Sequence, residues 1–101
     1  MNYQKLILVG NVTKDAEQRT SKKGDVSYTT FRVAVSGRKD SNPTFFPVTV
    51  FGKHGEAVLK WLTKGREVLV EGRIEVSESG RHNVIADSVR LGAEPTRKAT
   101  E

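Results

Sequence analysis

The sequence predicts an all-β protein, a five-stranded Greek-key barrel with one helix between the third and fourth strands. Short runs of branched or alternating apolar residues recur along the chain, and such runs are typical of strands. Only residues 52–65 change to the spacing of three and four that indicates a helix. At 101 residues the chain has room for one domain with one modest core.

The first strand begins with the apolar run Leu-Ile-Leu-Val at residues 6–9 and kinks at Gly10. We expect it to continue beyond the kink toward Arg19, and we expect residues 20–25 to form a polar loop. The second strand shows a period of two. Its apolar face carries Phe31, Val33 and Val35, and its other face carries Thr30, Arg32, Ala34 and Ser36.

The third strand covers residues 45–51 and follows an exposed loop at residues 37–44. In the helix the apolar stripe consists of Ala57, Val58, Trp61 and Leu62, and Lys64-Gly65 supplies a cationic end with a glycine stop. We expect Trp61 to lie in the core.

The last two strands cover residues 67–76 and 82–91, and a short hairpin that contains Gly80 joins them. Three strands, a helix and two further strands form the element order of the OB-fold. We assign residues 1–92 to this domain and residues 93–101 to a flexible polar tail.

Composition narrows the possible functions only slightly. Seventeen Lys and Arg against twelve Asp and Glu give a formal charge of +5, which mildly favours a polyanionic partner. The absence of cysteine excludes a disulfide framework, a thiolate metal site and a cysteine nucleophile. The apolar run at residues 6–9 is too short for a signal sequence or a membrane span. We therefore expect a soluble, cytoplasmic protein.

The third strand carries aromatic residues on both faces. Alternation places Phe46, Val48 and Val50 in the core and Phe45, Pro47, Thr49 and Phe51 on the opposite face, beside Thr30 and Arg32 of the second strand. Taken singly, a phenylalanine in a strand is a core residue more often than a ligand contact. Exposed rings stack on any base, so this face fits a nucleic-acid binder without sequence specificity.

Cationic side chains are expected around the same sheet face, in the loops and at strand ends. Each one taken singly is more often a solvated surface charge, but together they can hold a phosphate backbone. They are Lys22, Lys23, Arg38, Lys39, Lys53, Arg73 and Arg81.

Other chemistries find less support. The two histidines, His54 and His82, are 28 positions apart with no ligand cluster beside them, so we expect no metal and no cofactor. There is no phosphate-binding glycine loop of the required spacing. Glu71 and Glu75 are expected to pair with Arg73 or to face water. We expect no enzymatic activity.

Five segments in the same order resemble the signature blocks of bacterial single-stranded DNA-binding (SSB) proteins, over about residues 4–92. They are LILVGNV at residues 6–12, FRVAVS at 31–36, FFPVTVFGK at 45–53, LTKGREVLVEGR at 62–73 and ADSVRL at 86–91.

This resemblance implies an OB-fold, single-stranded DNA as the ligand, no catalysis, and a homo-oligomer, either a tetramer, which is favoured, or dimers built through the first strands. Phe45 and Phe51 stand where the family has base-stacking aromatics, and Trp61 stands where it has a helix tyrosine. A coating and protecting role in replication, recombination or repair would follow.

The sequence also departs from the family pattern. Residues 37–40 and 77–82 lack the further stacking tryptophans, and residues 92–101 lack the acidic tip that recruits replication and repair proteins. Either the sequence is a shortened form or this member does not recruit partners in that way. A bacterial, phage or plasmid origin fits such a compact member.

Two alternatives remain open. One is a primosome-type OB module that binds single-stranded DNA weakly and mainly docks other replication proteins. The other is an RNA-binding or cold-shock-like protein, which the helix between the third and fourth strands disfavours.

Overall fold

Six strands and one short helical segment make up the described part of the chain, residues 3–21, 24, 26–37 and 42–93 of a computed structural model. The helical segment, α1 followed by the 3₁₀ turn η1, lies between β4 and β5. The elements are β1 (Leu6–Val12), β2 (Glu17–Thr20), β3 (Ser27–Val35), β4 (Thr44–Phe51), α1 (Gly52–Val58), η1 (Leu59–Trp61), β5 (Glu67–Val76) and β6 (His82–Leu91).

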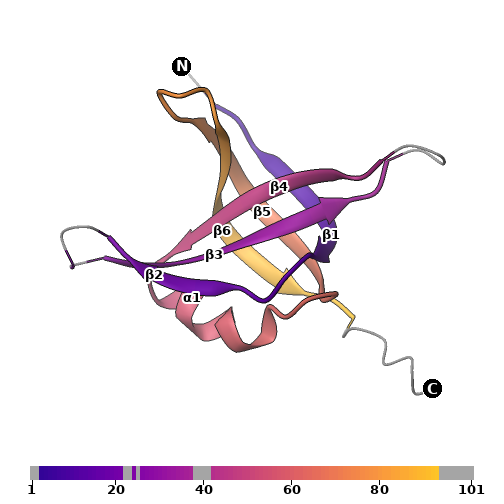
Figure 1. Ribbon diagram of the computed structural model, residues 1–101, viewed down its shortest axis with the longest axis horizontal. Helices are drawn as coiled ribbons and strands as arrows, with labels where there is room; N and C mark the ends of the chain where they lie inside the picture. The colour runs from indigo at the N-terminus through magenta and orange to yellow at the C-terminus, as the bar shows by residue number, and fades with distance from the viewer. Residues whose placement is uncertain (1–2, 22–23, 25, 38–41, 94–101) are drawn as a thin grey trace.

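Five of these strands close into a barrel. The sheet order is β1-β5-β6-β4-β3-β2, and a further pairing of β1 with β3 closes it. The pairing between β4 and β6 is parallel, and the others are antiparallel. In Figure 1, β3 and β4 run side by side across the front of the barrel, with α1 below them. The predicted OB-fold barrel is confirmed.

The first predicted strand is divided in two. β1 pairs with β5 over most of its length, whereas β2 pairs only with β3. The chain turns between them because residues Thr13 and Ala16 bond to other segments, Thr13 N–H to Arg32 O at 3.0 Å and Ala16 N–H to Leu62 O at 2.9 Å. Before this turn, a side chain at Gly10 would overlap the carbonyl oxygen of Ala34, so glycine allows β1 to close against β3.

The core fills the barrel from alternate positions of each strand. It follows the predicted alternation in β3 and β4, where Val33 is 0% and Val48 and Val50 are each 1% exposed. Phe46 is half-buried and packs against this core. The remaining buried members are Leu8, Val12, Phe31, Leu62, Val68, Val70, Val84, Ala86 and Val89.

The helix is shorter than predicted, and the expectation for Trp61 was wrong. α1 ends at Val58 and gives way to η1 at Leu59 to Trp61, so the predicted stripe does not stay in phase. Trp61 is 45% exposed, and Leu62 beside it is 0% exposed. Leu62 is fully buried in the core, and Val58 of α1 packs against the same core.

The last two strands have the bounds that the sequence predicted, and a hairpin at residues 77–81 joins them. Their register shifts between Glu71 and Gly72, which pair with Ser88 and Ala86. Asp87 is therefore an extra residue in β6, a β-bulge.

The described chain ends beside β5, where Gly92 N–H donates to Glu67 O at 2.7 Å and Ala93 N–H to the Glu67 carboxylate at 3.2 Å. The flexible tail was predicted for residues 93–101, and all of it except Ala93 lies outside the described residues. Among the helices that the structure describes, none has the length and hydropathy that a membrane crossing requires.

Candidate nucleic-acid interface

The outer sides of four neighbouring strands form one continuous surface. Thr30 of β3 pairs with Thr49 of β4, Thr49 with Ile85 of β6, and Ile85 with Arg73 of β5. With strands about 4.8 Å apart, this row is about 14 Å wide. We call the surface the binding face. It comprises Tyr28, Thr30, Arg32, Phe45, Pro47, Thr49, Phe51, Arg73, Glu75, Asn83, Ile85 and Asp87.

Two exposed phenylalanines stand at opposite ends of β4 on this face. Phe45 is 51% and Phe51 is 49% exposed, as the alternation predicted. They are six residues apart in one strand, which corresponds to about 20 Å. The two rings can therefore stack on different bases of one extended strand.

Tyr28 adds a third ring, which the sequence analysis missed. It lies opposite Phe51 in the register of β3 and β4, and the two ring centroids are 5.7 Å apart at an interplanar angle of 50°. The alternation of Thr30 and Arg32, extended back by two residues, would have found it. Tyr28 thus packs beside Phe51, and Phe51 remains 49% exposed.

Arg32 lies over the other phenylalanine. Its guanidinium carbon is 6.0 Å from the centroid of the Phe45 ring, within the range of a cation–π contact. A guanidinium in this position presents a flat surface and a positive charge together. Such a group can contact both a base and its phosphate, and the DNA contact of Arg32 stays a prediction.

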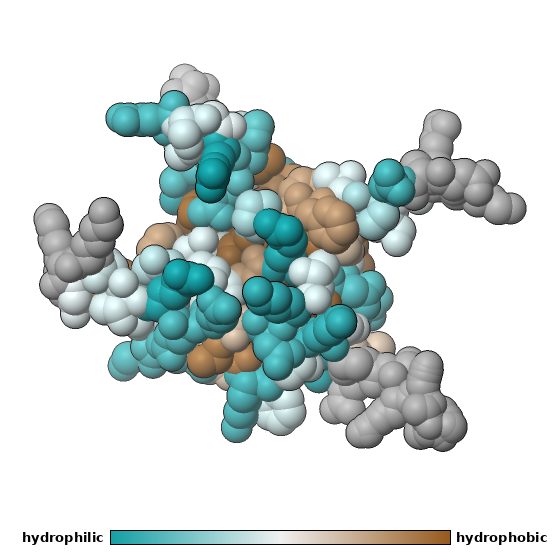
Figure 2. All heavy atoms as spheres, in the orientation of Figure 1, coloured by the Kyte–Doolittle hydropathy of each residue, from teal (hydrophilic) through white to brown (hydrophobic). Residues whose placement is uncertain are grey.

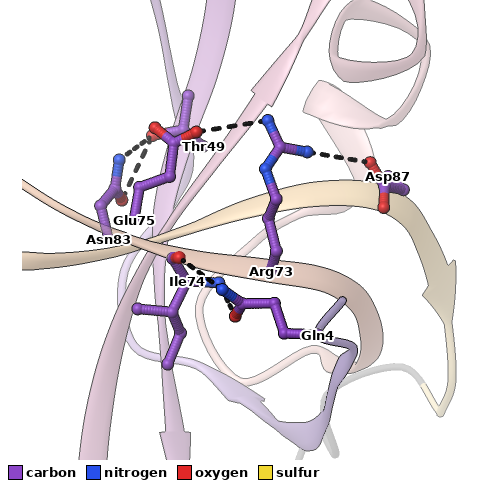
Figure 3. Close-up of polar contacts among 7 residues, drawn as sticks. All are labelled: Gln4, Thr49, Arg73, Ile74, Glu75, Asn83 and Asp87. Carbon is purple, nitrogen blue, oxygen red and sulfur yellow. Dashed lines mark hydrogen bonds and ion pairs between the residues drawn. The ribbon is translucent and has the colours of Figure 1, made fainter. Parts of the chain in front are cut away.

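Thr49 was expected to be exposed between the rings, and this expectation was wrong. The side chain is only 7% exposed because Asn83 of β6 covers it. The Asn83 amide N–H donates to the Thr49 hydroxyl at 3.1 Å, and the hydroxyl lies 3.4 Å from the amide oxygen (Figure 3). Thr49 thus positions Asn83, which the sequence analysis missed because the contact crosses 34 residues of chain.

Arg73 lies in the row but is engaged by carboxylates. Its guanidinium contacts the Glu75 carboxylate at 3.3 Å and the Asp87 carboxylate at 3.8 Å (Figure 3). The predicted pair with Glu75 is confirmed, whereas no ion pair with Glu71 occurs among the described residues. Asp87 was not anticipated.

A shallow groove continues the binding face toward the β1–β2 turn. Two further cations line it, Lys14 and Arg19, and both were missed by the sequence analysis. Arg19 contacts Glu17 at 2.8 Å in the same strand. In Figure 2, which has the orientation of Figure 1, this side of the molecule mixes hydrophilic and hydrophobic surface. The lining residues are Thr13, Lys14, Asp15, Glu17, Arg19, Thr30, Phe31, Arg32 and Pro47.

The other predicted cations lie at the margins or outside the described residues. Lys53 is exposed in the first turn of α1, two positions after Phe51, and Arg81 is exposed in the hairpin between β5 and β6. Lys22, Lys23, Arg38 and Lys39 lie outside the described residues.

The histidines serve no metal site in the part of the chain that is described, where no group of three or more metal-binding side chains occurs. His54 has a structural contact instead, because its Nε2 accepts a hydrogen bond from the Val89 N–H at 3.1 Å.

A closed OB barrel whose outer face presents rings, a guanidinium and polar side chains belongs to the class of oligonucleotide-binding OB proteins. Sequence comparison then defines the family. Residues 3–95 match the Single-strand binding protein family, and the chain belongs to that family. The resemblance found from the five sequence segments is thereby confirmed.

Relatives and solved structures agree with this assignment. A single-stranded DNA-binding protein of Helicobacter hepaticus is 30% identical over 88% of this chain and 61% of its own length. The crystal structure of a small single-stranded DNA-binding protein from Streptomyces coelicolor has a TM-score of 0.78 at 26% identity, covering 91% of this chain and 95% of that one. Mitochondrial Rim1 of S. cerevisiae, at 20% identity, covers 95% of this chain and all of its own with a TM-score of 0.84, which shows the shared fold.

The chain spans only part of the curated relatives that it matches. It covers 61%, 53% and 47% of the proteins from H. hepaticus, Treponema pallidum and Clostridium perfringens.

Proposed function

We propose that this protein binds single-stranded DNA without sequence preference, as a binding protein and not an enzyme. The observation that carries the proposal is the pair of half-exposed rings, Phe45 and Phe51, at the two ends of one outward-facing strand. Bases stack on such rings whatever their identity, at about 1–3 kcal/mol per base. The bacterial relatives are named single-stranded DNA-binding proteins, which points to the same ligand.

The cations of the face supply the phosphate contacts. Arg32 lies beside Phe45, Lys53 follows Phe51, and Lys14 and Arg19 line the adjoining groove. Because these side chains are exposed, their contribution depends on counterion release and weakens as salt is added. Lys22, Lys23, Arg38 and Lys39, which lie outside the described residues, are proposed to extend this contact.

We propose that the protein acts as a homo-oligomer, with a tetramer favoured, that coats DNA in replication, recombination or repair in the bacterial cytoplasm. The outer side of β1 supports assembly through that strand. Ile7 is 56% and Val9 51% exposed, whereas Leu8 between them is 6% exposed. An exposed apolar row on a strand is a common docking surface for a second copy.

The experiment is a fluorescence-anisotropy titration with labelled poly-dT, a matched duplex and poly-U at several salt concentrations. We expect tight binding of poly-dT, a steep loss of affinity with salt, and much weaker binding of the duplex. Weak and unselective binding of all three would contradict the proposal and favour the primosome-type docking module.

A further inference from the structure

Arg73 is the one cation in the row Thr30, Thr49, Ile85, Arg73, yet it does not extend freely from the sheet. Nη2 lies 3.3 Å from the Glu75 carboxylate and Nη1 lies 3.8 Å from the Asp87 carboxylate. Figure 3 shows the guanidinium between the two acids, with a contact from each of its terminal nitrogens. The Glu75 carboxylate accepts a hydrogen bond from one terminal nitrogen and the Asp87 carboxylate lies at ion-pair distance from the other, so both compete with a phosphate for this guanidinium.

The position of Asp87 has a structural cause. It is the bulge residue of β6, since Glu71 pairs with Ser88 and Gly72 pairs with Ala86, which leaves Asp87 without a partner in β5. Ile85 pairs with Arg73, and Asp87 lies two positions further along β6, on the same face and diagonal to Arg73. Its carboxylate therefore lies within ion-pair distance of the Arg73 guanidinium.

Both contacts are open to exchange with solvent ions. The side chains are 47% exposed for Arg73, 56% for Glu75 and 70% for Asp87. Exposed ion pairs of this kind are weak, and the distances are longer than those of a strong bidentate pair. A phosphate diester offers the same negative charge and two oxygens to the same nitrogens.

We propose that Glu75 and Asp87 act as intramolecular phosphate mimics, which hold Arg73 on the binding face until a nucleic-acid phosphate replaces them. In this role the two acids lower the affinity of the binding face for nucleic acid. This inference rests on the proposed function. The inference goes beyond that function because it assigns a role to two acids on a surface that binds an anion.

The exchange has a consequence for salt dependence. When a phosphate displaces the acids, its own counterion is released, but the freed carboxylates take up a cation. The net release at Arg73 is therefore small in the wild-type protein. Neutralising either Glu75 or Asp87 reduces this cation uptake. The plot of the logarithm of the binding constant against the logarithm of the salt concentration then becomes steeper, by up to about 0.7 for one phosphate on a single strand.

The test is a double-mutant cycle between Asp87→Asn and Arg73→Gln, measured by poly-dT anisotropy over a salt series. Asp87→Asn should raise affinity about two- to fivefold at low salt and steepen the salt slope. In the Arg73→Gln background the same change should have no effect on the slope and less than half of the effect on affinity. Glu75→Gln should act in the same direction as Asp87→Asn.

The matched control is Glu71→Gln, which makes the same charge change on the same strand. Glu71 lies opposite Ile7 of β1 and has no ion pair with Arg73 among the described residues. Its substitution should leave the salt slope unchanged. Thermal denaturation of each variant verifies that the barrel remains folded.

The outcomes separate this inference from the proposed function. If the wild type binds poly-dT and Asp87→Asn changes neither affinity nor slope, the exchange is wrong and the binding function stands. An equal gain in the Arg73→Gln background would show simple repulsion and also overturn it. If the wild type fails to bind poly-dT, both proposals fall.

Discussion

At the scale of single residues, the binding face depends on which outward positions stay open. Phe45 and Phe51 remain half exposed, whereas Thr49 between them is closed by Asn83. Strand alternation was sufficient to assign the direction of all three side chains. It could not show the cover over Thr49, because that cover comes from a parallel pairing of β4 with β6 that no local pattern encodes.

Thr29 offers a test of packing under the helix. Its side chain is 0% exposed and its hydroxyl has no hydrogen-bond partner among the described residues. Replacing a buried, unsatisfied hydroxyl with a methyl group of the same shape removes a desolvation cost, so Thr29→Val should raise the free energy of unfolding by about 1 kcal/mol. Urea denaturation measures the change. Thr30→Val, on the half-buried outer side, is the control, and a loss of stability in Thr29→Val would contradict the packing described.

Gly55 of α1 lies close to Thr29. A Cβ there would lie 2.7 Å from the Val50 carbonyl oxygen and 2.8 Å from the Thr29 hydroxyl. Helix propensity alone favours alanine by about 1 kcal/mol, but overpacking costs about 1–3 kcal/mol. We expect Gly55→Ala to lower the unfolding midpoint in urea. A raised midpoint would mean that the helix is less closely seated than described.

At the scale of elements, the strands were more predictable than the helix. The bounds of β5 and β6 follow directly from alternation and from the glycine-containing hairpin between them. The break between β1 and β2 was not predicted, since it depends on hydrogen bonds from Thr13 and Ala16 to distant segments. Sequence showed a kink at Gly10 but not two separate pairing partners.

The error at Trp61 has a geometric cause. An apolar stripe at spacings of three and four assumes that every residue rotates the helix by about 100°. In a 3₁₀-helix each residue rotates it by about 120°. The chain enters η1 at Leu59, so the phase has shifted by the time it reaches Trp61. Leu62 consequently takes the buried place, and Trp61 lies outside with Lys60 5.2 Å from its ring.

The burial of Leu62 and the exposure of Trp61 lead to a prediction in which one residue serves as the control for the other. Leu62→Ala removes a side chain that is 0% exposed and should cost about 2–5 kcal/mol of stability. Trp61→Ala removes a larger side chain that is 45% exposed and should cost less. Chemical denaturation of both variants measures the order. A larger loss in Trp61→Ala would contradict the placement of the two residues.

At the scale of the whole molecule, the order of the predicted strands and helix indicated the barrel, and five sequence segments indicated the family. The formal charge of +5 gave only a weak indication of an anionic partner, because the face itself contains acids beside its cations. The contact of Asp87 with Arg73 could not be predicted, since it requires the register of β5 and β6.

Assembly through β1 also belongs to this scale. If a second copy covers Ile7 and Val9, replacing both with lysine should place like charges in the contact and shift the protein to a monomer. Sedimentation velocity measures the change. Val76→Lys is the control, because Val76 is a 57% exposed valine at the far end of β5. An unchanged sedimentation coefficient in the double variant would contradict assembly through this strand.

The central claim is that DNA bases stack on the outer face of β4. The most direct measurement is the affinity of the Phe45→Ala, Phe51→Ala double variant for labelled poly-dT, compared with wild type and with Trp61→Ala, which removes an exposed ring outside this face. Loss of two stacking rings should weaken binding by at least about tenfold, while Trp61→Ala binds as wild type does. A double variant with wild-type affinity would contradict the claim and place the DNA elsewhere on the barrel.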